Sequence, residues 1–265
     1  MKIKNASPNN VLRDIVKEYY FIHLDAKSKT KQIPIIDDCS YDLIFFKEAK
    51  AIFVCDTIPK NILINEKIFT IHNLKPPFKI RFDKTLTFFT IKLQPWVNGY
   101  FFSHLMGRGI INLESLDEKL LEFYRDVFKK ENIEKIFMIA DELMLHKNFD
   151  LSNSMVLVKS ICQYIEEKKG IITVNELGEH FNKSRQYLNK IFKREVLYSL
   201  KYFITASRIL SLVKYKSKNS DISLTTICYE YGYFDQPHFI ADFKKVCGVT
   251  PTQFFNNLPE FLLRH

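Results

Sequence analysis

The chain has 265 residues, of which 46% are hydrophobic and 26% are charged, and this composition excludes both wholesale disorder and a membrane-spanning bundle. At roughly 150 residues per domain, the length favours about two domains, each able to bury its own core. Lysine and arginine outnumber aspartate and glutamate by 39 to 30, and residues 151–265 hold 16 basic against 10 acidic residues, so a polyanionic partner is indicated.

The N-terminus and the cysteines bear on where the protein works. The first ten residues contain no apolar segment typical of a signal peptide, and no run of about 18 uncharged apolar residues follows. The five cysteines lack C-x-x-C spacing, which argues against a disulfide framework, a zinc site and a redox pair. We therefore expect a cytoplasmic, nucleoid-associated protein with no membrane partner, no metal and no cofactor.

The first 93 residues contain short apolar stretches rich in β-branched and aromatic residues. This composition is typical of strands in an antiparallel sheet or barrel. The expected strands cover residues 19–24, 41–46, 51–55, 61–64, 67–71, 78–82 and 86–93. Apolar residues then recur at helical spacing over 116–128 and 133–144, which predicts two trailing amphipathic helices. Their apolar stripes pack either on their own domain or, in a homodimer, on a second subunit.

The polar residues 148–154 form the expected linker, and everything beyond them has a helical pattern. A helix from about 154 to 168 is followed by Gly170, which fits a C′ position, and by the capping-box pair Thr173 and Glu176. The predicted fold class is therefore α+β. Residues 1–147 form a β-rich sensor or dimerisation domain with trailing helices, and residues 155–265 form an all-α domain.

The all-α domain contains an internal repeat. Residues 191–194 match residues 242–245 at an offset of 51, and Ser199 matches Thr250. Each unit has the pattern of a helix-turn-helix, with Ser184 and Asp235 as the expected caps of the two second helices. The uninterrupted segment from Ser199 to Lys216 predicts a linker helix about 27 Å long. Such a spacer can hold two recognition helices in successive major grooves of double-stranded DNA.

The predicted recognition helices carry polar side chains on one face, and these are the candidate DNA contacts. Amides suit adenine, and lysine can donate to guanine or phosphate. The expected base-reading residues are Gln186, Asn189, Lys190, Gln236 and His238. The expected phosphate contacts are Arg185, Lys193, Arg194, Lys244 and Lys245. Since the second helix has fewer long donors, we expect the first helix to be the main reader of sequence.

Residues 222–255 resemble the signature of AraC/XylS-type transcription regulators. The matching segments are Gly232-Tyr233-Phe234-Asp235-Gln236, His238-Phe239, Phe243-Lys244-Lys245 and Gly248-Val249-Thr250-Pro251. The resemblance extends over residues 155–256, with departures at Leu197, Leu200 and Pro237. It implies transcription regulation, base reading at Gln186, Asn189 and Lys190, and RNA polymerase as a partner. A weaker resemblance of residues 30–115 to the family's sensor region implies a small-molecule effector.

Enzyme chemistry finds little support in the sequence. The seven histidines show no H-x-H or H-E-x-x-H spacing, and neither G-x-S-x-G nor a phosphate-cradling glycine loop occurs. We therefore expect no catalytic activity. Two alternatives stay open: the β domain mediates assembly only, without ligand control, or it is an enzyme fused to a DNA-binding module.

Overall fold

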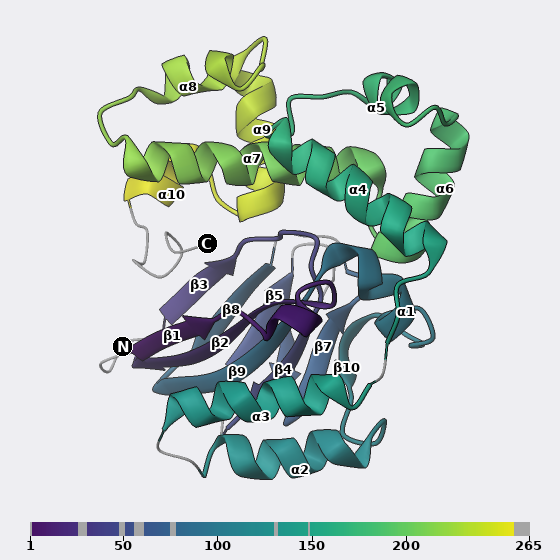
Figure 1. Ribbon diagram of the computed structural model, residues 1–265. Helices are drawn as coiled ribbons and strands as arrows, with labels where there is room; N and C mark the ends of the chain where they lie inside the picture. The colour runs from purple at the N-terminus through teal and green to yellow at the C-terminus, as the bar shows by residue number, and fades with distance from the viewer. Residues whose placement is uncertain are drawn as a thin grey trace.

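The structure is a computed structural model that describes residues 2–25, 31–47, 51–55, 61–74, 78–129, 132–147 and 149–256. Two β-sheets lie at the centre of the molecule, with helices α2 and α3 on one side and helices α4 to α10 on the other (Figure 1). The predicted α+β class, a β-rich part followed by an all-α part, is confirmed.

The strands form two antiparallel sheets. The six-stranded sheet has the order β1 (Lys2–Ala6), β2 (Val16–Asp25), β9 (Thr85–Leu93), β4 (Asp42–Phe46), β7 (Ile68–His72) and β10 (Gly109–Asn112). The four-stranded sheet has the order β3 (Lys31–Ile35), β8 (Phe78–Phe82), β5 (Ala51–Cys55) and β6 (Ile62–Ile64). All seven predicted strands are present. The pattern does not predict β1, β3 and β10, whose sequences KIKNA, KQIPI and GIIN mix polar residues or proline with few apolar ones.

Helices α2 (Glu118–Val127) and α3 (Ile133–Leu145) cover the outer face of the six-stranded sheet. The Phe123 ring lies 4.9 Å from the Phe45 ring, and the Phe137 ring lies 6.1 Å from that of Phe89. Both apolar stripes are thus buried against their own domain, which is the first of the two predicted alternatives. The stripes therefore no longer argue for a dimer.

Short helices connect the sheet to the rest of the chain. They are η1 (Asn10–Leu12), η2 (Pro95–Val97) and α1 (Asn98–Phe102). The helical part then comprises α4 (Asn153–Glu167), α5 (Val174–His180), α6 (Arg185–Val196), α7 (Leu200–Lys218), α8 (Leu224–Glu230), α9 (Gln236–Cys247) and α10 (Pro251–Asn256). Residue 148, the first of the predicted linker, lies outside the described residues, and Ser152 within that linker caps α4.

Polar caps start the helices where the sequence predicts them. The Glu176 amide donates to Thr173 Oγ1 at 3.3 Å, and the Thr173 amide donates to Glu176 Oε2 at 2.7 Å, which completes the capping box. Ser184 accepts from the Tyr187 amide and Asp235 from the His238 amide. Ordinary capping chemistry therefore fixes where the recognition helices begin.

Gly170 has a packing role that the sequence pattern does not show. Lys169, with φ of 54°, takes the expected C′ position, and Gly170, with φ of 68°, comes one residue later. A Cβ atom at Gly170 would lie 2.4 Å from the Arg208 amide nitrogen and 2.6 Å from the Ile204 carbonyl oxygen. The glycine therefore lets α4 and α7 approach closely.

The β-rich part and the helical part are in direct contact through α1 and α6. The fully buried Asn98 donates to the Val196 carbonyl at 3.0 Å and to the Cys39 carbonyl at 2.8 Å. A Cβ atom at Gly99 would lie 2.2 Å from the Arg194 carbonyl oxygen, so backbone packs on backbone there. One hydrophobic core accordingly runs from the six-stranded sheet into the helices.

A buried carboxylate also joins the two parts. Asp37 accepts hydrogen bonds from the Tyr202 hydroxyl at 2.9 Å and the Tyr198 hydroxyl at 3.2 Å. The side chain is only 5% exposed. Burial raises the pKa of Asp37 to about 6, against the opposing effect of hydrogen bonds from the Cys39 amide and the two tyrosines.

No single helix in the described part of the chain is long and apolar enough to cross a bilayer. Helices α6 and α7 meet the length and composition criteria only when taken together, and they are bent by 69° at the break between them.

Replacing Gly170 with alanine should destabilise the chain much more than replacing Gly232. Gly232 has φ of 73°, and a Cβ atom there would meet only Ile171 Cγ2, at 3.4 Å. The left-handed backbone alone should therefore cost Gly232→Ala about 1 kcal/mol of unfolding free energy. Gly170→Ala adds the clash with α7 and should cost clearly more. Urea unfolding of both variants tests this, and equal losses would contradict the packing role.

The chain should lose stability as the pH rises from 5 to 7.5. The folded Asp37 carboxyl holds a proton up to about pH 6, whereas the unfolded one releases it near its usual value of 3.8, so the folded state binds more protons in between. Asp37→Asn should flatten this slope by on the order of 2 kcal/mol. Urea unfolding at both pH values measures it, with the exposed Asp126→Asn as control. Part of the slope should persist, because burial also raises the pKa of Asp42 to about 6.

Candidate nucleic-acid interface

The two helix-turn-helix units are built alike. In each turn one residue adopts a left-handed backbone, Asn182 with φ of 49° and Gly232 with φ of 73°. In each, an amide after that residue bonds back to the first helix: the Lys183 amide to the Gly178 carbonyl at 2.9 Å, and the Tyr233 amide to the Cys228 carbonyl at 3.1 Å. The repeat in the sequence therefore corresponds to a repeated three-dimensional motif.

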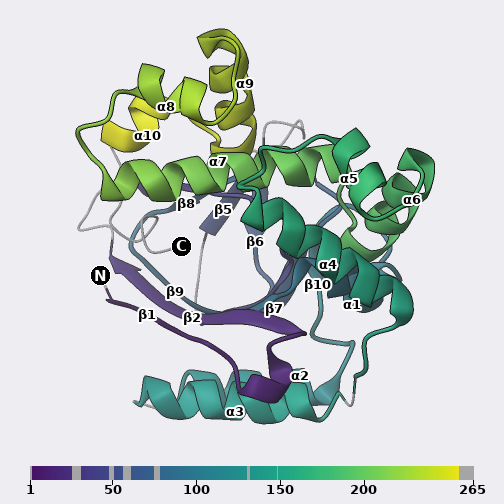
Figure 2. The same ribbon diagram turned by 45° about the horizontal axis from the view of Figure 1, so that its top comes forward.

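Helix α7 carries both units. Its 19 residues extend about 28 Å at 1.5 Å per residue. The α5–α6 unit lies at the start of α7, and the α8–α9 unit packs farther along it (Figures 1 and 2). One continuous helix thus sets the spacing between α6 and α9.

The predicted reading face of α6 is exposed to solvent as a group. Leu188, Ile191 and Phe192 are buried on the inner side of the helix. The exposed residues on the other side are Arg185, Gln186, Asn189 and Lys190. The Asn189 amide nitrogen donates to the Arg185 carbonyl at 2.8 Å, so this side chain must change rotamer before it can read a base.

The predicted reading residues of α9 are also exposed, and both already have a partner. Gln236 Nε2 donates to Thr225 Oγ1 at 2.9 Å, and His238 Nε2 lies 3.5 Å from Asp242 Oδ2. Pro237 occupies the first turn of the helix, where its missing amide costs nothing. Both side chains lie on the accessible start of α9.

Phe234 is a candidate contact that the sequence reasoning missed. Its side chain is 91% exposed, directly before the Asp235 cap of α9. An exposed aromatic ring at the start of a recognition helix can contact a thymine methyl group. The available signal was an aromatic residue in a turn between two buried helices.

The predicted phosphate contacts lie in different settings. Lys244 and Arg185 are exposed, whereas Lys193 donates to the Leu197 carbonyl at 2.6 Å. The Lys245 ammonium lies 5.2 Å from the centre of the Tyr202 ring. Arg194 differs most from expectation: its guanidinium is 2.7 Å from the buried Glu195 carboxylate, at the end of α6 that docks on α1.

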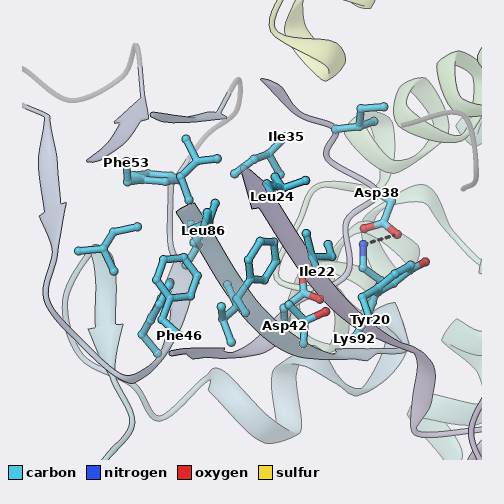
Figure 3. A pocket seen from close by; sticks show the side chains of 18 of the residues that line it. Tyr20, Ile22, Leu24, Ile35, Asp38, Asp42, Phe46, Phe53, Leu86 and Lys92 are labelled. Atoms are coloured by element: carbon cyan, nitrogen blue, oxygen red, sulfur yellow. Dashed lines mark hydrogen bonds and ion pairs between the residues drawn. The ribbon is translucent and has the colours of Figure 1, made fainter. Parts of the chain in front are cut away.

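The β domain contains a cavity between its two sheets, of about 180 Å³. Its wall is apolar except at one end, where Tyr20, Asp38, Asp42 and Lys92 converge (Figure 3). Leu210 of α7 also lines it, so the cavity touches the helical part. Sequence reasoning missed this polar set, because charged residues within a strand normally indicate the solvent face. Elsewhere in the described residues, no group of three or more potential metal ligands occurs.

The comparisons with known proteins concern mainly the helical part. A family profile described as "Helix-turn-helix domain" matches residues 177–257. The melibiose operon regulatory protein of Escherichia coli (strain K12) is 28% identical over 110 residues, which are 41% of this chain and 36% of that protein. The Msm operon regulatory protein of Streptococcus mutans is 30% identical over 118 residues, 44% of this chain and 42% of that protein. The chain thus matches less than half the length of these relatives.

A solved structure resembles almost the whole fold. Apo ToxT from Vibrio cholerae strain SCE256 has a TM-score of 0.50 at 15% identity, over 91% of this chain and 98% of that one. This likeness extends over the sheets as well as the helices. The tandem units, the signature sequence and the related operon regulators agree, and the C-terminal part of the chain is a DNA-binding helix-turn-helix domain of the AraC/XylS type.

Proposed function

We propose that the whole chain is a sequence-specific transcription regulator that places α6 and α9 in successive major grooves of DNA. The observation that carries this proposal is the pair of exposed polar helix faces joined by the single helix α7. A spacing of about 28 Å along α7, with the reading helices projecting from it, is compatible with one turn of B-DNA, about 34 Å. The basic excess of residues 151–265 adds attraction to phosphate.

The β domain is the proposed modulator of DNA binding. Its cavity supports a small-molecule effector over a domain that serves assembly alone, and Leu210 gives an occupant direct contact with α7. A ligand changes the domain arrangement only if it binds one arrangement better than another. Asn98, Gly99 and Asp37 are the contacts such a change would alter. RNA polymerase is a further proposed partner, on the basis of the family resemblance.

Genome-wide capture of DNA bound by the full chain, with and without metabolite extract, tests this proposal. We expect enrichment of sites with two half-sites about one helical turn apart, and extract should change their occupancy. Binding without sequence preference, or no salt-sensitive binding at all, would contradict the proposed function. Unchanged occupancy with every extract would instead favour an assembly role for the β domain.

Gln186→Ala and Lys244→Ala should weaken DNA binding in different ways. Gln186 lies on the exposed face of α6, so its loss should relax base preference at one position by about 1–3 kcal/mol. Lys244 is an exposed charge on α9, so its loss should weaken all sequences alike and reduce the salt slope by about one unit. Binding selections and salt titrations of the full chain distinguish the two. The reverse pattern would contradict α6 as the main reader.

A further inference from the structure

The polar end of the β-domain cavity holds an unusual set of charges. Lys17 and Lys92 both donate to Asp38 Oδ2, at 2.8 and 3.1 Å. Asp42 pairs with Lys92 in the register of β4 and β9, so its side chain faces the same end of the cavity. No hydrogen bond reaches the Asp42 carboxylate within the described residues. Asp42 is therefore the polar group that still lacks a close partner.

The lysines are already matched by carboxylates. Although burial lowers the pKa of the Lys92 ammonium, the neighbouring Asp38 and Asp42 raise it above its usual value. Burial also opposes ionisation of Asp38, but Lys17 and Lys92 hold its pKa below the usual value. An incoming anion would have to displace Asp38 from Lys92 and would then meet the Asp42 carboxylate. The cavity end thus disfavours anions.

A cation has the opposite prospects. Burial raises the pKa of Asp42 to about 6, which reports the cost of keeping this carboxylate charged inside an apolar cavity. A bound ammonium would offset that cost by a charge-assisted hydrogen bond. The remaining wall is formed by apolar side chains such as Ile22, Ile44, Phe46 and Leu86 (Figure 3).

The volume limits the ligand. An apolar protein cavity of about 150 Å³ holds one benzene molecule, and the cavity here is about 180 Å³. The space therefore suits one ring, or an alkyl chain of similar bulk, with a short polar arm.

We propose that the β-domain cavity binds a small apolar amine, an arylalkylamine or a short alkylamine, with its ammonium group on Asp42. Leu210 places the apolar part of this ligand against α7, the helix that spaces the two recognition helices. The regulatory consequence rests on the proposed function, whereas the binding itself does not.

Three matched probes test the charge preference on the full chain: phenethylamine, 2-phenylethanol and 3-phenylpropionate. They share a phenyl ring and a short arm and differ in the head group. Calorimetric titration and thermal unfolding should show phenethylamine binding about tenfold more tightly than 2-phenylethanol, as expected for one charge-assisted hydrogen bond. 3-Phenylpropionate should give no stabilisation. Equal binding of all three, tighter binding of 3-phenylpropionate, or no binding of phenethylamine would overturn the proposal.

Asp42→Asn identifies the carboxylate. This variant keeps the shape of the side chain and should reduce phenethylamine affinity about tenfold while changing that of 2-phenylethanol little. Asp126→Asn, an exposed change on α2, is the matched control and should leave all affinities unchanged. Ile44→Phe, which fills part of the cavity, should weaken phenethylamine and 2-phenylethanol alike. An unaltered preference for the amine in Asp42→Asn would place the ammonium elsewhere and contradict the proposal.

DNA binding by the same samples separates this inference from the proposed function. A chain that binds phenethylamine through Asp42 but no specific DNA would refute the proposed function and leave the amine site intact. A chain that binds specific DNA but none of the probes would refute only the amine site.

Discussion

The contact of α1 with α6 is the constraint on which the rest of the structure depends. With no side chain at Gly99, the backbone of α1 reaches the Arg194 carbonyl, and the buried amide of Asn98 bonds to the Val196 carbonyl at the end of the same helix. One end of the first recognition helix is thereby fixed to the β domain, while the opposite end presents Gln186 to solvent. A single helix links the part of the molecule that binds a small ligand to the part that binds DNA.

The second recognition helix has a different relation to the β domain. Its connection runs mainly through α7 and through contacts such as the Asp37 amide with the Val246 carbonyl, at 3.4 Å. The two units are alike in their turns and caps but unlike in how they are held. Differential attachment of this kind gives a ligand a means of moving one unit relative to the other, provided that it binds one arrangement better.

Local sequence features predicted most of the fold, and nonlocal contacts account for what they missed. The caps Thr173, Ser184 and Asp235 act on amides three residues away, so their role can be predicted without the tertiary structure. By contrast, the inward direction of Asp42 and Lys92 depends on a second sheet that closes over them. Arg194 carries the right charge for a phosphate contact, but its place beside Glu195 depends on where another domain docks.

The uninterrupted helix α7 makes the phasing of the two DNA-reading units discontinuous. Inserting or deleting one residue between them would shift the second unit by 1.5 Å along the axis and rotate it by about 100° around it. Such a step swings α9 off the face of the duplex that α6 contacts, and about seven residues are needed to restore the angle at the cost of some 10 Å. Half-site separation is therefore far harder to change by mutation than the base preference at either half-site, which depends on single exposed side chains.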